Sequence, residues 1–180
     1  MQISEPRRKD VTFKIISAGD GGVGKTTMLY RFVENRFTVD TKMTIGVGFF
    51  QKNVDLGDGN IYSLQLWDLG GEAHFRPFQD KYVLGVDGAF LMFDLTRLVT
   101  LKSIDKWVNL IRKEDPNCPI ILIGSKLDLK DKISVTDEVP LGLKEKYNFI
   151  DYLKVSSKTG YNVNDVFTLL TGKILKYKKF

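Results

Sequence analysis

The chain has 180 residues, of which 43% are apolar and 12% aromatic, and its 27 lysines and arginines outnumber its 22 acidic residues, for a net charge of +5. This composition predicts one globular domain with a sizeable core and excludes a disordered or low-complexity chain. The single cysteine, Cys118, excludes an internal disulfide framework and a cysteine-rich zinc site, so we expect a reducing, cytoplasmic compartment.

Short apolar runs alternate with segments of helical period along the chain, which is typical of βα units around a mostly parallel sheet. Residues 11–18 are predicted to form a strand, residues 19–24 a glycine-rich turn and residues 25–34 a helix. Two further strands are predicted at residues 47–55 and 61–67. The turn between them contains Asp-Gly, which predicts that this pair is antiparallel.

The second half of the chain continues the pattern. Residues 88–93 and 120–123 are apolar throughout, as expected of central strands that are covered on both faces. Two predicted helices carry apolar residues at steps of three and four: Leu101, Ile104, Val108 and Ile111 in one, and Val163, Phe167, Leu170 and Ile174 in the other. Asn162 is the expected start of the last helix. Together the elements predict an α/β fold with a six-stranded, mostly parallel sheet and one antiparallel edge strand.

A phosphate-binding motif lies between the first predicted strand and helix. Residues 19–26 read G-D-G-G-V-G-K-T and satisfy the pattern G-x-x-x-x-G-K-[ST]. Its glycines allow backbone N–H groups to approach phosphate oxygens at a helix N-terminus, Lys25 adds positive charge, and the Thr26 hydroxyl suits Mg²⁺. The alternative, a glycine-rich turn with an accidental Lys-Thr, is disfavoured by the strand–turn–helix context. The motif predicts a P-loop three-layer sandwich that binds a nucleoside triphosphate.

Four more motifs follow in the loops where an open α/β sheet binds its ligand. They are Thr44-Ile45-Gly46, Asp68-Leu69-Gly70-Gly71-Glu72, Ser125-Lys126-Leu127-Asp128 and Ser156-Ser157-Lys158. In this order, the five motifs resemble those of the Ras superfamily of small GTPases, and the phrases TIGVGFF, WDLGGE and FDLT are closest to its Rab-like branch. The resemblance covers about residues 11–178.

This resemblance implies a site for GTP or GDP with Mg²⁺. The residues that it implies for nucleotide binding are Gly21, Gly22, Val23, Gly24, Lys25, Thr26, Thr27, Phe37, Thr44, Gly71, Ser125, Lys126, Asp128, Ser156, Ser157 and Lys158. The metal site is implied at Thr26, at Thr44 while the γ-phosphate is present, and at Asp68 through a bound water. The implied catalytic residues are Lys25, Gly71 and Glu72.

Base identity is argued from Asp128, because a carboxylate accepts from both the N1–H and the 2-amino group of guanine, and adenine offers neither donor. The resemblance implies that Lys126 lies along the base and braces the P-loop, and that the backbone of Ser157 donates to O6. Ser125 replaces the family's asparagine. Serine lacks the amide that ties the loops together and meets base N7, so we expect reduced nucleotide affinity and faster exchange.

A second departure from the family is Glu72, which stands where the family has a catalytic glutamine. Glutamine both accepts and donates, whereas a carboxylate only accepts and brings negative charge towards an anionic γ-phosphate. We therefore expect slow intrinsic hydrolysis. Gly21 leaves room for an arginine supplied by another protein, and no arginine directly precedes Thr44. The only histidine, His74, is expected to face a partner rather than to take part in the chemistry.

The implied switches are the segments around Thr44 and from Gly71 to Tyr82, which bind effectors, an exchange factor and a GTPase-activating protein. Phe49, Trp67 and Tyr82 resemble the aromatic cluster of a Rab-like partner surface, although core packing explains Phe49 and Trp67 equally well. The leading hypothesis is a guanine-nucleotide switch. The alternatives are a GTP-binding adaptor with negligible turnover, a P-loop kinase and, least favoured, a nucleic-acid-binding module.

The positive charge is confined to the two ends. We expect one G domain over residues 1–180, in which residues 1–10 and residues 173–180 form short basic ends around a neutral body. This distribution argues against a nucleic-acid partner, and the C-terminal lysines suit a solvated helix end better than a lipid surface. The chain carries neither cysteines for prenylation at its end nor a glycine after Met1, so we expect no encoded membrane anchor. We also expect the protein to be a monomer.

Overall fold

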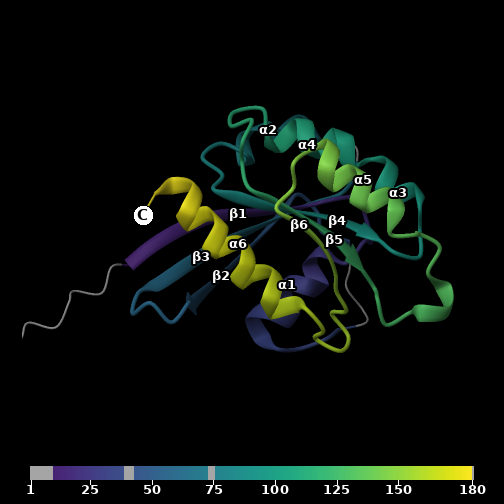
Figure 1. The fold of residues 1–180 in the computed structure, drawn as a ribbon, viewed down its shortest axis with the longest axis horizontal. Coiled ribbons are helices and arrows are strands. Elements are labelled where there is room, and N and C mark those ends of the chain that lie inside the picture. Colours follow the sequence, from purple (N-terminus) through teal and green to yellow (C-terminus); the bar gives the residue numbers. More distant parts are fainter. Residues whose placement is uncertain (1–9, 39–42, 73–75, 180) are drawn as a thin grey trace, which may run out of the picture.

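The computed structural model describes residues 10–38, 43–72 and 76–179 (Figure 1), and His74 lies outside them. Their strands are β1 (Asp10–Ala18), β2 (Val47–Asp55), β3 (Ile61–Leu69), β4 (Gly88–Asp94), β5 (Ile120–Ser125) and β6 (Asp151–Lys154). The α-helices are α1 (Lys25–Glu34), α2 (Arg76–Tyr82), α3 (Val99–Lys102), α4 (Ile104–Ile111), α5 (Glu138–Lys146) and α6 (Val163–Lys178). No helix of these described residues is long and apolar enough to cross a membrane.

The strands form one six-stranded sheet in the order β2-β3-β1-β4-β5-β6. β3, β1, β4, β5 and β6 run parallel, and β2 pairs antiparallel with β3 at one edge, with Phe49 opposite Trp67. The predicted α/β class, strand number and antiparallel edge are therefore confirmed. Because the parallel strands share one direction, the loops that follow them gather at a single edge of the sheet, where such folds bind ligands.

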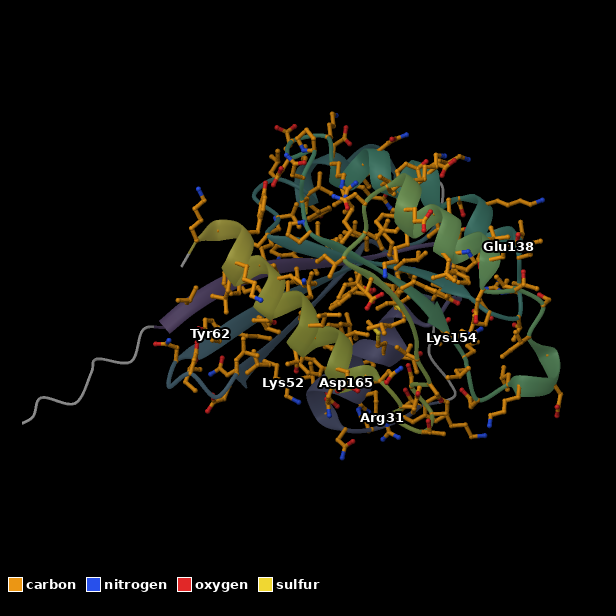
Figure 2. All side chains as sticks on the ribbon, viewed as in Figure 1. Arg31, Lys52, Tyr62, Glu138, Lys154 and Asp165 are labelled. Atoms are coloured by element: carbon orange, nitrogen blue, oxygen red, sulfur yellow. The ribbon has the colours of Figure 1, made fainter. Side chains whose placement is uncertain are left out.

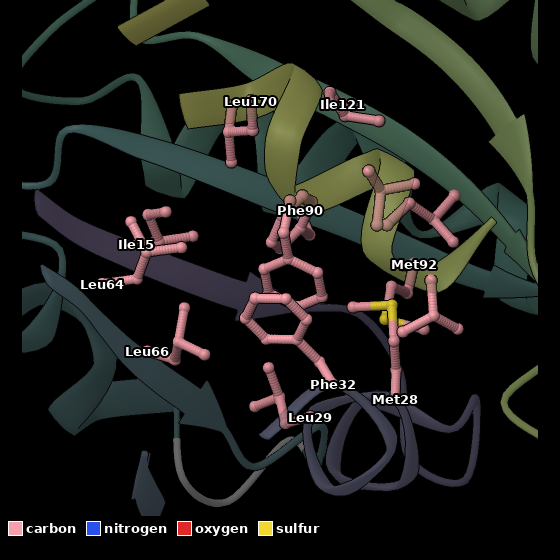
Figure 3. Close-up of a cluster of buried hydrophobic side chains, with 14 of the residues drawn as sticks. Ile15, Met28, Leu29, Phe32, Leu64, Leu66, Phe90, Met92, Ile121 and Leu170 are labelled. Atoms are coloured by element: carbon pink, nitrogen blue, oxygen red, sulfur yellow. The ribbon is translucent and has the colours of Figure 1, made fainter. Parts of the chain in front are cut away.

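Helices cover both faces of the sheet. Figure 1 shows α1 and α6 on one face and α2, α3, α4 and α5 on the other. In the core beneath α1 and α6, Met28 and Phe32 point towards Met92 and Phe90 of β4 (Figure 3), and the rings of Phe32 and Phe167 stack with their centroids 3.6 Å apart. This contact joins α1, the helix that follows the P-loop, to α6.

The predicted helix over residues 101–111 is divided at Ser103 into α3 and α4. The hydroxyl of Ser103 donates to the carboxylate of Asp20, and the indole Nε1 of Trp107 lies 3.3 Å from the same carboxylate, so a contact with the P-loop occupies the point of division. α6 begins after Asn162 as predicted. The amide of Asn162, however, donates to the Lys154 carbonyl at 2.9 Å and makes no side-chain cap.

Polar side chains lie on the outside of both helical layers. Glu138 of α5 and Asp165 of α6 are exposed at the periphery (Figure 2). At the C-terminal end of α6, Lys178 forms an ion pair with Asp87, which also accepts a hydrogen bond from the backbone of Lys14 at 2.6 Å. One lysine of the basic C-terminal segment is thus tied to the sheet.

Candidate nucleotide-binding site

Two adjoining cavities open where the loops leave the carboxyl edge of the sheet. The first is lined by Gly21, Gly22, Gly24, Lys25, Thr26, Thr27, Met43, Thr44, Gly71 and Glu72. The second has a volume of about 370 Å³ and is lined by Gly22, Val23, Gly24, Thr27, Phe37, Thr38, Ser125, Lys126, Asp128, Leu129, Ser157 and Lys158. Gly22, Gly24 and Thr27 line both, so the cavities form one continuous site.

Nearly all of the sequence-predicted nucleotide residues line one or both cavities. Ser156 lies behind the second cavity, where its hydroxyl donates to Oδ1 of Asp128 at 2.7 Å. Met43, Thr38 and Leu129 also line the site and were missed by sequence reasoning. Each adjoins a predicted residue in the chain, and no motif marks it.

The P-loop holds its lysine in a buried position. Gly22 and Gly24 have φ angles of 72° and 99°, which glycine adopts without strain, and α1 begins immediately afterwards at Lys25. The Lys25 ammonium donates to the carbonyls of Gly19 and Asp20 at 2.8 and 2.9 Å and is 5% exposed. Burial lowers the pKa of Lys25 to about 8, although the negative charges of Asp68 and Asp20 oppose this shift.

This burial makes binding of a diphosphate dependent on pH. Above pH 8, Lys25 is largely neutral in the nucleotide-free protein, so GDP must bind together with a proton. We expect GDP affinity to fall by up to about tenfold per pH unit above this pKa. The measurement is the ratio of GDP to guanosine affinity from about pH 7 to about pH 9. Guanosine carries the same base without phosphate and controls for base titration, so a constant ratio would contradict the assignment.

The same shift predicts a stability change of opposite sign. In the nucleotide-free protein the unfolded chain binds more protons than the folded chain between about pH 8 and Lys25's ordinary pKa of 10.5. The free energy of unfolding of the nucleotide-free protein should therefore increase as pH rises through this window, whereas the affinity for GDP should fall.

Three oxygen-bearing side chains converge beside Lys25. The hydroxyls of Thr26 and Thr44 lie 2.6 Å apart. Both hydroxyls donate to Oδ2 of Asp68, and the distance from the Thr44 hydroxyl is 3.2 Å. Asp68 is buried, and burial raises the pKa of its carboxyl, although the hydrogen bond from Thr26 lowers it in part. Among the described residues, its Oδ1 is buried without a hydrogen-bond partner. A hard cation that prefers oxygen ligands, such as Mg²⁺, fits this donor set.

Gly71 lies directly against the P-loop. A Cβ added to Gly71 would come within 2.3 Å of the Gly21 nitrogen and 2.4 Å of the Asp20 carbonyl carbon. Gln79 of α2 is buried and donates to the carbonyl of the preceding Gly70 at 2.8 Å, so α2 helps to hold this approach. Gly21 itself faces more open space, because among the described residues its added Cβ would meet only the terminal methyl of Met43, at 3.3 Å.

In the second cavity, Ser125 and Lys126 make hydrogen bonds or ion pairs with other segments of the chain. The hydroxyl of Ser125 lies 2.5 Å from the Val23 carbonyl and 2.9 Å from the Phe93 carbonyl, so serine still ties this loop to the P-loop. The expected loss of that tie is therefore wrong, and only the missing contact to base N7 still supports weaker binding. The ammonium of Lys126 pairs with Asp94 at 2.7 Å.

Two arginines that sequence reasoning missed also hold these loops. Arg31 of α1 (Figure 2) donates to the carbonyl of Lys158 at 2.6 Å, and Arg97 donates to the carbonyl of Gly21 at 3.2 Å. Arg97 thus contacts the P-loop directly, in addition to the brace that the resemblance implies for Lys126. Neither arginine belongs to a nucleotide-binding motif, so no sequence pattern indicated them.

A model of the Ras family matches residues 14–176 of this chain. The chain belongs to the Ras family. Ras-related protein RABA6b of Arabidopsis thaliana is 37% identical over 166 residues, 92% of this chain and 72% of the relative. Ras-related protein YPT3 of Nicotiana plumbaginifolia is 36% identical over 160 residues, 88% and 72% of the two chains. Ras-related protein Rab11E of Lotus japonicus is 34% identical over 168 residues, 93% and 76%.

These relatives place the chain on the Rab-like branch, as its motifs indicate, so the protein is a small GTPase that binds and hydrolyses GTP. The three aromatic residues of the expected partner surface are in contact in this Ras-family chain. The ring centroids of Phe49 and Trp67 lie 5.4 Å apart, edge to face, and those of Trp67 and Tyr82 lie 6.0 Å apart. Phe49 is 53% exposed, so core packing does not explain its position.

Proposed function

We propose that this Rab-like GTPase is a molecular switch that hydrolyses GTP slowly and binds a protein effector in its GTP state. One observation carries the proposal: Lys25 and two threonines line the first cavity, a buried aspartate accepts hydrogen bonds from both threonines, and Asp128 lines the adjoining cavity. This arrangement supports triphosphate recognition in the first cavity and guanine recognition in the second.

In the proposed complex, the backbone N–H groups of the P-loop and the Lys25 ammonium bind the phosphates. The Asp128 carboxylate accepts from N1–H and the 2-amino group of guanine, and its hydrogen bond from Ser156 fixes its orientation. Phe37, which lines the second cavity and is 38% exposed, packs against the nucleoside, and the Ser157 backbone donates to O6.

Thr26 and Thr44 would hold Mg²⁺ directly, and Asp68 through a bound water. When bound, Mg²⁺ neutralises charge on the β and γ phosphates. The buried Oδ1 of Asp68 has no hydrogen-bond partner in the part of the chain that the structure describes, and this supports the assignment, because such an oxygen is costly unless a cation or water meets it.

In hydrolysis, Lys25 stabilises negative charge on the phosphates, and the N–H of Gly71 donates to the γ-phosphate. Glu72 lines the same cavity, where a carboxylate accepts from the attacking water but donates nothing to it. Slow turnover follows from this lost donor and added negative charge.

Replacing Gly71 with alanine is expected to lower the affinity for GTP about tenfold relative to GDP, because overpacking against backbone costs about 1–3 kcal/mol. The added methyl would strike the backbone of Gly21 and Asp20, so the segment must withdraw from the γ-phosphate. Competition binding of GTP and GDP measures the ratio. Gly142→Ala is the matched control, because an added Cβ there meets no described atom within 4 Å apart from the backbone of its own helix. Equal ratios in both variants would remove Gly71 from the γ-phosphate site.

The proposed partner surface covers the segments near Thr44 and from Gly71 to Tyr82. Ile45 is 83% exposed next to Thr44, and Phe49 continues the apolar surface on β2. A γ-phosphate contact at Thr44 would therefore order side chains that a protein effector can read, and an exchange factor and a GTPase-activating protein would bind the same segments. We propose a cytoplasmic monomer without nucleic-acid partners.

Identification of the nucleotide released when the purified protein is denatured tests the proposal. Released GTP supports the slow switch, released GDP indicates working hydrolysis, and the absence of both would contradict the site. A second candidate, a GTP-binding adaptor with negligible turnover, is favoured by Glu72 alone. Single-turnover hydrolysis with and without a candidate activating protein separates the two, because an adaptor would hydrolyse GTP in neither condition.

A further inference from the structure

A buried carboxylate outside both cavities connects the two halves of the site. Asp94, at the end of β4, is fully buried, and its Oδ1 accepts from the backbone and hydroxyl of Thr96 at 2.9 and 2.7 Å. Its Oδ2 accepts from Lys126 at 2.7 Å and from Nε of Arg97 at 2.9 Å. Asp94 therefore holds one cation of the base-binding loop and one cation that extends towards the P-loop.

Arg97 uses the other end of its guanidinium on the P-loop. Its Nη2 donates to the carbonyl of Gly21 at 3.2 Å and lies 3.5 Å from the position that a Cβ on Gly22 would occupy. The planar fork of arginine allows Nε and Nη2 to bind two acceptors at once, which a lysine ammonium on a flexible stem does not reproduce. Arg97 is thus fixed at Asp94 and placed to hold the Gly21–Gly22 peptide.

The geometry of a trans peptide turns this contact into a constraint on phosphate binding. The C=O and N–H of one peptide unit point in opposite directions, and the described residues contain no cis peptide bond. With the Gly21 carbonyl directed at Arg97, the Gly22 N–H is directed away from Arg97, and Gly22 lines both cavities. Neither glycine has a side chain to resist rotation of this peptide.

We infer that Arg97 is a positioning residue that orients the Gly21–Gly22 peptide, so that the Gly22 N–H is already aimed at the phosphates before the nucleotide arrives. The inference rests on the proposed function, because it assigns the N–H to a bound di- or triphosphate. Without Arg97, the peptide samples orientations that present a carbonyl to the phosphates. Nucleotide binding must then supply the ordering that Arg97 now provides.

Nucleotide release tests the inference. Arg97→Ala is expected to accelerate GDP dissociation about tenfold, the lower end for loss of a hydrogen bond from a charged group, because Arg97 is exposed. Arg97→Lys keeps the charge but loses the fork, and it should release GDP nearly as fast as Arg97→Ala. Lys146→Ala on α5 removes an equal charge outside the lining of both cavities and should match the natural protein.

A second readout separates orientation of the P-loop from general support of the fold. The affinity for GDP should fall in Arg97→Ala while the affinity for guanosine, which has no phosphate, stays unchanged. Loss of both affinities, or full rescue by Arg97→Lys, would overturn the inference, as would an unchanged GDP release rate. Circular dichroism and melting of the nucleotide-free variants check folding. If the natural protein itself binds no GDP, the proposed function fails instead.

Discussion

Replacing Asp128 with asparagine is expected to shift the preference of the site from guanine to xanthine nucleotides. Asparagine keeps one acceptor for N1–H but presents an amide donor where guanine has its 2-amino group, so two donors meet. Xanthine carries a carbonyl oxygen at that position and accepts from the amide. Since each hydrogen bond to a charged group contributes about 1.5–3 kcal/mol, loss of the paired contact should lower GTP affinity at least about a hundredfold.

Equilibrium binding of the guanine and xanthine triphosphates to the variant measures this change. Asp131→Asn makes the same chemical change on an exposed carboxylate three residues further along and should bind GTP as the natural protein does. Asp128→Ala offers the base neither a donor nor an acceptor, and it should lose GTP without gaining the xanthine nucleotide. If Asp128→Asn still prefers GTP, Asp128 does not read the base.

Much of the fold could be predicted because local signals agree with it. The predicted range of α1, residues 25–34, matches the observed helix, since the P-loop starts it and Asn35, with a φ of 51°, ends it. The β2–β3 hairpin follows from its turn residues. α5 has no such signal: its only buried residue is Pro140, so no apolar face marks it. At the division between α3 and α4, Ser103 contacts Asp20, which is 83 residues away in the chain and which no local pattern indicates.

The same distinction applies to the site. The residues proposed to contact phosphate or base lie within short motifs, because loops after parallel strands each contribute a contiguous segment. The residues that hold those segments in place lie outside the motifs. Arg97 contacts Gly21 of the P-loop across 76 residues of chain, and Arg31 contacts Lys158 across 127. At Ser125, sequence reasoning predicted the loss of a contact that the structure keeps. The hydrogen bond from Ser125 to Val23 depends on a close approach of the end of β5 to the P-loop, which no sequence spacing indicates.

Replacing Glu72 with glutamine is expected to accelerate intrinsic GTP hydrolysis. The substitution keeps the carbonyl acceptor for the attacking water, adds an amide donor and removes a negative charge from a cavity built to receive phosphate. Because one correctly placed donor is worth about 100- to 1000-fold in other enzymes, and water orientation is only part of the barrier, we expect an increase of about tenfold to a hundredfold. Single-turnover hydrolysis of preloaded GTP measures the rate.

Two further variants separate the reasons for the increase. Glu72→Ala removes the negative charge without supplying a donor, so a rate as high as that of Glu72→Gln would assign the effect to charge alone. Glu138→Gln makes the same substitution on the exposed surface of α5 (Figure 2) and should leave the rate unchanged. If the natural protein hydrolyses GTP as fast as Glu72→Gln or faster, the carboxylate does not slow turnover. Some group other than an amide at position 72 must then place the water.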